Sequence, residues 1–160
     1  MQYKGTLIAI SDMEKSKKFY RDLLGMQVVG DFGANVQLEN GLFLQTKETW
    51  ENFIANKEIK LDHNAGELYF ETQDMDAFLK LLEMFQVEYV HEPKEHSWGQ
   101  RAVRFYDPDH HMIEVAEDLV MVMMRFANSG MSVEEVAVRM DVPVSYIKDH
   151  LGYIKVITSK

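Results

Sequence analysis

The sequence predicts an α+β protein, with two βαβββ modules packed around a concave cavity and a three-helix extension at the C-terminus. One observation is an internal repeat, because the Ser-Asp-Met of residues 11–13 returns as Gln-Asp-Met at residues 73–75. The other is periodicity, because each of these Asp residues follows a strand-like run and precedes a helical pattern. We therefore divide the chain into a duplicated domain at residues 1–117 and a helical extension at residues 118–160.

The first module spans about residues 1–60 and begins with a strand at 6–10, which is rich in β-branched and apolar residues. Asp12 is the expected N-cap of the next helix, and Gly25 is its expected end. The Asn40-Gly41 pair predicts a tight hairpin turn. The three strands expected after the helix lie at 27–29, 35–39 and 42–46.

The second module, at 64–117, repeats this order with a strand at 67–72 and a helix capped by Asp74. One face of that helix is apolar at steps of three and four residues, which predicts a buried stripe. The stripe consists of Met75, Phe78, Leu79, Leu82 and Phe85. The strands expected next lie at 88–91, 101–106 and 112–115. In the turn at 107–110, Pro108 fixes a corner and His110 is expected to adopt a left-handed conformation.

The extension predicts three helices. The first runs from Asp118 to Ser129, a Ser132–Glu135 capping box opens the second, and Ser145 caps a third that ends near Tyr153. Residues 131–147 resemble a helix-turn-helix of small regulators, but residues 117–160 carry six acidic and five basic side chains, which disfavours contact with DNA phosphates. We expect a small bundle that packs on the modules, covers the cavity or joins two subunits.

The composition excludes several classes of function. The chain carries a net charge of −9, which argues against non-specific nucleic-acid binding and against docking on anionic lipid. It has no cysteine, so disulfides, thiolate metal sites and a cysteine nucleophile are excluded. The N-terminus lacks the apolar stretch of a signal peptide, and the longest apolar run, at 119–124, is too short to span a membrane. The expected location is the cytoplasm.

Two segments resemble the opening and closing motifs of the vicinal oxygen chelate superfamily, which includes glyoxalase I, bleomycin-resistance proteins and extradiol dioxygenases. The opening segment is residues 8–25, and the closing one comprises Trp98-Gly99-Gln100-Arg101, residues 105–109 and Ile113-Glu114. The resemblance implies the βαβββ fold, a small-molecule ligand and a homodimer. It leaves function open, because the superfamily contains metalloenzymes and metal-free binders.

Metal enzymes of this superfamily hold a divalent ion with four side chains, which come from the first and last strands of each module. Carried over residue by residue, the resemblance implies Gln45, Glu67 and Glu114 as ligands, whereas the first position is Gly5, which has no side chain. Such a reduced site would take Mn, Ni, Zn or Mg, with oxygen ligands favouring Mg²⁺ or Mn²⁺, or it would hold no metal.

Three functions remain open. The first is a glyoxalase-like lyase or isomerase with a degenerate metal site, in which Glu114 is a ligand or general base and Glu67 a ligand or proton acceptor. The second is a metal-free protein that sequesters a drug or metabolite, with the acidic cavity favouring a cation. The third is a ligand-responsive regulator, which the charge of the extension disfavours. In each case Trp98, Arg101 and Gln45 are the expected substrate-binding residues.

Overall fold

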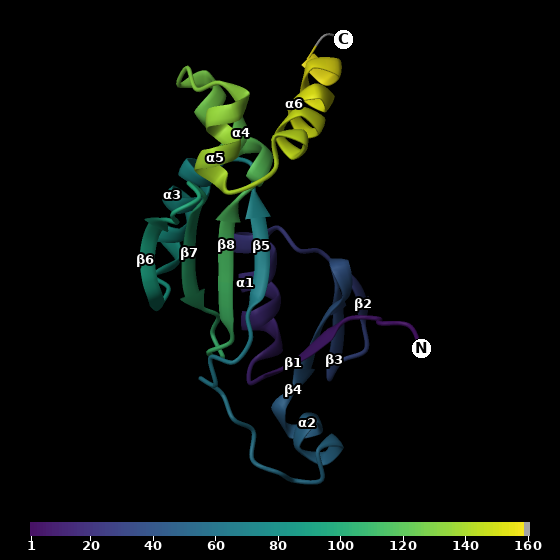
Figure 1. The fold of residues 1–160 in the computed structure, drawn as a ribbon. Coiled ribbons are helices and arrows are strands. Elements are labelled where there is room, and N and C mark those ends of the chain that lie inside the picture. The colour runs from purple at the N-terminus through teal and green to yellow at the C-terminus, as the bar shows by residue number, and fades with distance from the viewer. Residues whose placement is uncertain (159–160) are drawn as a thin grey trace. The chain divides into compact units, whose positions relative to one another are not determined.

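A computed structural model describes the backbone of residues 1–158 and the side chains of residues 1–151. The predicted duplication is confirmed, because strand, helix and three strands occur twice in the same order before the final helices (Figure 1). The first set is β1 Thr6–Ile10, α1 Met13–Leu24, β2 Val28–Asp31, β3 Asn35–Leu38 and β4 Leu42–Thr46. The second set is β5 Leu68–Thr72, α3 Met75–Phe85, β6 Tyr89–Glu95, β7 Arg101–Tyr106 and β8 Met112–Glu117. The remaining helices are α2 Lys47–Phe53, α4 Leu119–Asn128, α5 Val133–Met140 and α6 Val144–Thr158.

The two sheets share one topology. Their strand orders are β1-β4-β3-β2 and β5-β8-β7-β6, so in each module the first strand pairs with the last. In the first sheet β1 runs parallel to β4, whereas β3 runs antiparallel to both β4 and β2. The sequence repeat is therefore a repeat of topology as well as of motif.

The register of the first sheet separates a core face from a polar face. Ile8 lies beside Leu44 and both are buried on the face that packs against α1. Because side chains alternate along a strand, the neighbouring pair Ala9 and Gln45 lies on the opposite face. Asn35 of β3 is the register partner of Gln45, so it shares this opposite face. The predicted ligand position on β4 is thus on the side of the sheet away from α1.

The predicted helix boundaries of the modules are confirmed by their hydrogen bonds. A carboxylate oxygen of Asp12 accepts from the Lys15 amide at 3.0 Å, and Asp74 accepts from the Ala77 amide at 2.9 Å. Gly25 ends α1 with a φ of 71°, in the left-handed region that glycine adopts without strain. The hairpin turn is a short 3₁₀ segment, Glu39–Gly41, which joins β3 to β4.

The turn after β7 ties the second module to α1. The Tyr20 hydroxyl donates to a carboxylate oxygen of Asp107 at 2.7 Å, and Asp109 accepts from the Ser11 amide at 2.9 Å. Asp107 also accepts from the Asp109 and His111 amides, at 2.9 and 2.8 Å. The left-handed conformation predicted for His110 is confirmed by its φ of 64°.

The extension has an apolar core of its own. The buried side chains that it contributes are Val122, Met123, Phe126, Val136, Ala137, Met140 and Ile147. The predicted capping box of α5 is confirmed, with the Ser132 hydroxyl accepting from the Glu135 amide and the Glu135 carboxylate accepting from the Ser132 amide. The cap predicted for the third helix is wrong, because α6 begins at Val144, directly after Pro143, and Ser145 lies inside its first turn.

Several strand boundaries differ from the sequence prediction. β2 covers Val28–Asp31 instead of residues 27–29, and β3 ends at Leu38 instead of residue 39. β5 begins at Leu68, so Glu67 lies just before the strand. β6 continues to Glu95 and β8 to Glu117, beyond the ends expected at residues 91 and 115. Most residues added to β6 are polar and exposed, so the alternation of apolar side chains cannot reveal them. No helix in the described part of the chain is long and apolar enough to cross a membrane.

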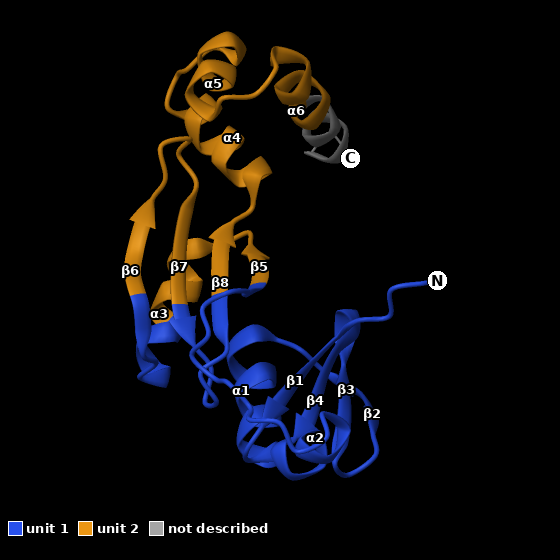
Figure 2. Ribbon diagram, turned by 60° about the horizontal axis from the view of Figure 1, so that its bottom comes forward, with its two compact units in different colours: residues 1–68, 81–90, 105–113 blue, residues 69–80, 91–104, 114–160 orange. Residues whose placement is uncertain are grey.

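The chain separates into two compact units (Figure 2). Unit 1 comprises residues 1–68, 81–90 and 105–113, and unit 2 comprises residues 69–80, 91–104 and 114–160. Each unit carries part of the predicted site, and each is described by itself below.

Candidate functional site

Gln45 is buried in unit 1 and both ends of its amide are hydrogen bonded. Its carbonyl oxygen accepts from the Asn35 amide at 2.7 Å, and its NH₂ group donates to the Thr49 hydroxyl at 2.5 Å. Thr49 belongs to α2, so Gln45 links β3 and β4 to the start of that helix. This linkage gives Gln45 a structural role that does not require a metal ion.

Gly5, the first position of the implied ligand set, has no room for a side chain. A Cβ atom at Gly5 would lie 1.9 Å from the carbonyl oxygen of Gly41 and 2.8 Å from the ring of Phe43. The φ of Gly5 is +150°, which L residues rarely adopt. The absence of a side chain at this ligand position therefore follows from the close contact between the segment before β1 and the β3–β4 turn.

Replacing Gly5 with Ala is expected to lower the free energy of unfolding by about 1–3 kcal/mol, because the new methyl group must displace the Gly41 carbonyl or the chain before β1. Urea unfolding followed by circular dichroism measures this loss. Gly33→Ala is the matched control, because Gly33 also has a positive φ, of 76°, but no neighbouring atom near its Cβ position. Equal losses in the two variants would contradict the steric explanation.

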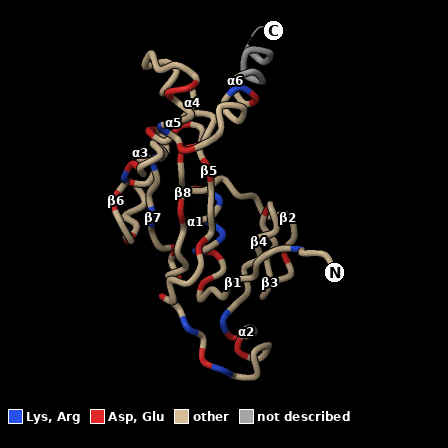
Figure 3. Tube along the Cα trace, viewed as in Figure 1, with Lys and Arg blue, Asp and Glu red and all other residues tan. Residues whose placement is uncertain are grey.

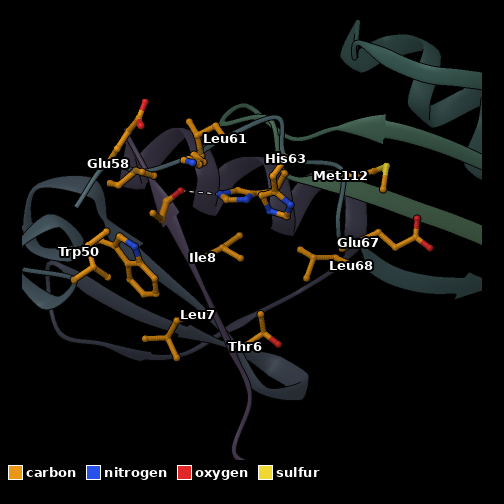
Figure 4. A pocket seen from close by; sticks show the side chains of 16 residues that line it. Thr6, Leu7, Ile8, Trp50, Glu58, Leu61, His63, Glu67, Leu68 and Met112 are labelled. Atoms are coloured by element: carbon orange, nitrogen blue, oxygen red, sulfur yellow. Dashed lines mark hydrogen bonds between the residues drawn. The ribbon is translucent and has the colours of Figure 1, made fainter. Parts of the chain in front are cut away.

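A pocket of about 370 Å³ lies in unit 1 along β1, and we call it the Trp50 pocket (Figure 4). Its apolar lining comes from β1, from α2 and from the segment that leads into β5. These side chains are Leu7, Ile8, Ala9, Trp50, Ile54, Ile59, Leu61, Leu68 and Met112. The volume and the single large ring at one end are typical of a site for a small organic molecule.

Two histidines line the Trp50 pocket, and their hydrogen bonds define their tautomers. The Ala65 amide donates to Nδ1 of His63 at 3.1 Å, so a neutral His63 ring carries its proton on Nε2. The Nε2 of His111 lies 2.7 Å from the carbonyl oxygen of Ala9, which can only accept, so His111 donates there and keeps Nδ1 as an acceptor. The pocket thus has one ring donor and one ring acceptor available for a ligand.

Glu67 also lines the Trp50 pocket, together with Glu58 and Lys60. In Figure 4 the carboxylates of Glu58 and Glu67 lie at its two sides and point away from the apolar centre. The two acidic groups therefore contribute negative charge at the rim and leave the interior apolar.

Glu114 lies in unit 2 and is ion-paired. Its side chain is buried, and one carboxylate oxygen accepts from the Arg104 guanidinium. The same guanidinium lies 3.2 Å from Nε2 of His91, whose Nδ1 lies 2.8 Å from the Glu92 carbonyl. Because the carbonyl can only accept, His91 is protonated on Nδ1 and Nε2 accepts from Arg104. Figure 3 shows the basic positions of β7 beside the acidic positions of β8.

The loop between β6 and β7 carries Trp98, which is 38 % exposed. Its indole stacks on His96 at 4.3 Å between ring centroids and donates to the side-chain oxygen of Gln100 at 3.0 Å. Gln100 donates in turn to the Tyr69 hydroxyl at 3.4 Å. Burial, and then a hydrogen bond to Glu71, raise the pKa of Tyr69 to about 12, so Tyr69 remains a neutral donor at physiological pH.

Arg101 is engaged in ion pairs within unit 2. Its guanidinium donates to both carboxylate oxygens of Glu117, at 3.2 and 3.1 Å, and to Asp76 at 2.7 Å. The predicted substrate-binding role of Arg101 remains a prediction, and its observed contacts join α3 to the end of β8.

The residues present do not fit the four-ligand metal site that the family pattern implies. The first position is sterically closed at Gly5, Gln45 is held by two partners, and the Glu114 carboxylate is neutralised by Arg104. Within the part of the chain that the structure describes, no group of three or more His, Asp or Glu side chains is arranged to hold a metal ion.

Trp50 and the contact between Arg104 and His91 were absent from the sequence prediction. Trp50 follows β4 on a short helix that the repeat does not contain, so no module position pointed to it. Arg104 and His91 meet through the pairing of β7 with β6, which depends on strand register. One signal was present for Arg104, because a buried carboxylate at Glu114 requires a nearby cation.

A model of the glyoxalase-like domain matches residues 3–120. An uncharacterized protein of Bacillus subtilis, YraH, is 27% identical over 120 residues, which are 68% of this chain and 91% of that protein. A crystal structure of a protein of unknown function from Agrobacterium tumefaciens is 36% identical, with a TM-score of 0.66 over 74% of this chain and 94% of that one. A lactoylglutathione lyase from the same species is 23% identical, with a TM-score of 0.55 over 74% of this chain and 95% of that one, and it shows the shared fold.

Proposed function

Because the chain belongs to the glyoxalase-like domain family, we propose that it binds a small organic molecule in the Trp50 pocket and does so without a catalytic metal ion. The observation that carries this proposal is Gly5, where backbone contacts close the first metal-ligand position. The binding function needs only the pocket, whereas the lyase function needs a bound divalent ion.

The lining of the Trp50 pocket favours a planar and mostly apolar ligand. The Trp50 ring supplies a stacking surface at one end, and His63 and His111 supply one donor and one acceptor. Glu58 and Glu67 outnumber Lys60 in the lining, which on a chain of net charge −9 favours a ligand that carries a positive charge. A planar organic cation therefore combines the features that the pocket can recognise.

A metal-dependent lyase or isomerase is the second candidate. It is supported by the carboxylates of Glu67 and Glu114 at two of the four family positions and by the lactoylglutathione lyase among the structural neighbours. In that function a bound Mg²⁺, Mn²⁺, Ni²⁺ or Zn²⁺ would polarise neighbouring substrate oxygens. Glu114 would first have to exchange its Arg104 pair for the ion.

The binding proposal is tested by titration of the Trp98→Phe variant, in which Trp50 is the sole tryptophan. N-methylquinolinium is expected to quench Trp50 emission with a dissociation constant of about 1 mM or tighter, and neutral quinoline should bind more weakly. Leu7→Arg should abolish the quenching because residue 7 lines the pocket. Val28→Arg is the control, because Val28 is similarly exposed, at 43% against 41%, and belongs to β2.

The two candidates are separated by elemental analysis after incubation with each of the four ions. The proposed function predicts less than stoichiometric metal and no formation of lactoylglutathione from methylglyoxal and glutathione. One bound ion per chain, lost on Glu114→Gln substitution, would overturn the metal-free proposal in favour of the lyase.

A further inference from the structure

The α5 and α6 helices lie beyond the part of the chain that matches the glyoxalase-like family, yet the extension makes specific contacts with the β6–β7 loop. We call residues 96–100 the Trp98 loop. Arg125 of α4 donates to the carbonyl of Gly99 at 2.5 Å, and Arg139 of α5 donates to the carbonyl of Ser97. Two backbone carbonyls of this short loop thus accept hydrogen bonds from the extension.

The same arginines are held by carboxylates next to the loop. Glu95 accepts from Arg139 at 2.9 Å and lies 3.5 Å from Arg125. Arg125 also donates to both carboxylate oxygens of Glu117, at 3.3 and 3.0 Å. Arg125 is therefore held by two carboxylates and Arg139 by one, and each guanidinium also donates to a loop carbonyl.

Phe126 fills the space beside Gly99. A Cβ atom on Gly99 would lie 2.2 Å from the Phe126 ring, and Gly99 adopts a φ of +90°. The guanidinium carbons of Arg125 and Arg139 lie 4.9 and 5.4 Å from the centroid of that ring. Gly99 allows the close approach, and the ring and the two cations form one contact surface for the loop.

The Trp98 loop carries Trp98, one of the residues predicted to bind substrate. The His96 amide donates to the Gln100 carbonyl and the Gly99 amide to the His96 carbonyl, both at 2.8 Å, so the loop is a closed turn. The side chain of Gln100 bridges the Trp98 indole and the backbone carbonyl of Glu117, at 3.0 and 2.8 Å. A shift of the turn would therefore move both Trp98 and Gln100.

We propose that α4 and α5 position the Trp98 loop, so that the C-terminal extension controls the conformation of Trp98 and Gln100. Arg139 and Arg125 are positioning residues here, since they act on Trp98 through the loop backbone. This positioning role is independent of the proposed binding in the Trp50 pocket.

The test uses the full chain with Trp50→Phe, so that Trp98 is the sole tryptophan and its fluorescence reports on the loop without any ligand. Arg139→Gln removes the donor to the Ser97 carbonyl from a partly exposed position. The acrylamide quenching constant of Trp98 is expected to rise by about twofold or more, because the freed loop opens locally. Gly99→Ala, which presses a methyl group into Phe126, should produce the same change from the loop side.

Lys148→Gln is the matched control, because it removes a cation of the extension whose partner is Glu134, at 3.8 Å. Its quenching constant should equal that of the parent. If Arg139→Gln lowers the melting temperature but leaves Trp98 quenching at the parent value, the extension only adds stability and the positioning proposal is overturned. Equal rises for Arg139→Gln and Lys148→Gln would overturn it as well. A positive quenching result combined with no ligand binding would leave the positioning intact and reject the binding function.

Discussion

Glu117→Gln is expected to lower the free energy of unfolding by about 2–4 kcal/mol. The Glu117 side chain is only 5 % exposed and accepts hydrogen bonds from Arg101 and Arg125. Removing one member of a buried ion pair typically costs about 3–5 kcal/mol. The value is reduced here because both arginines are about one-third exposed and regain water. Urea denaturation at pH 7 measures the difference.

The contribution of Glu117 should depend on pH. Burial, the largest influence, acts to raise its pKa, but the hydrogen bonds from Arg101 and then Arg125 outweigh burial and hold the pKa below the ordinary 4.5. Because the folded-state pKa is lowered, the stabilisation is complete above pH 4.5 and is lost as the pH falls through the folded-state pKa. The stability gap between parent and Glu117→Gln should therefore shrink in acid.

Glu92→Gln is the control for that experiment, because Glu92 is an exposed residue of β6. It should change the free energy of unfolding by no more than about 0.5 kcal/mol. A gap between parent and Glu117→Gln that keeps its full size down to pH 3 would show that the lost packing, and not the charge, accounts for the destabilisation.

The features that could be predicted from the sequence are those determined within a few residues. The Asp12 cap and the Ser132–Glu135 capping box depend on side chains that bond to backbone groups three positions away, and the Gly25 end depends on the left-handed backbone that glycine adopts. The repeat then extended these local signals to the whole topology, since both sheets adopt the order first, fourth, third and second strand. Local rules and duplication together account for the success with the fold.

The candidate site was predictable only as a set of positions. The absence of a side chain at Gly5 is visible in the sequence, but the contact with Gly41 that closes the position depends on how the chain enters β1. The pairing of Glu114 with Arg104 and the hold of Asn35 on Gln45 both cross between strands, so they depend on register. The Trp50 pocket depends on a helix and a connecting segment outside the repeat, where residues such as Asp62 and Asn64 adopt positive φ.

Asp107→Ala is expected to be the most destabilising of the substitutions considered, with a loss of about 3–5 kcal/mol. The buried carboxylate of Asp107 accepts from the Tyr20 hydroxyl and from the Asp109 and His111 amides. All three donors would lose their acceptor, and an unsatisfied buried donor costs about 1–3 kcal/mol. Tyr20→Phe removes one donor and leaves the two amide bonds, so its loss should be less than half as large. Urea midpoints of the two variants give the comparison.

The charge state of Asp107 predicts a dependence of stability on pH that lost packing alone would not produce. Burial is the largest influence and raises the pKa of Asp107 above the ordinary 3.8, although the charge of His111 and the hydrogen bond from Tyr20 partly offset it. Because the folded state binds the Asp107 proton more tightly, the contribution of Asp107 to stability is greatest at low pH and falls as the pH rises from 3.8 through the folded-state pKa. Asp107→Asn keeps an acceptor oxygen and cannot titrate, so the free energy of unfolding of the parent relative to Asp107→Asn should increase as the pH is lowered across that window.

Glu117 predicts the opposite slope in acid, and the two carboxyl groups are therefore distinguished by comparing each parent–variant difference over the same pH series. A difference for Asp107→Asn that decreases toward acid would mean that the hydrogen bonds to this carboxylate outweigh its burial.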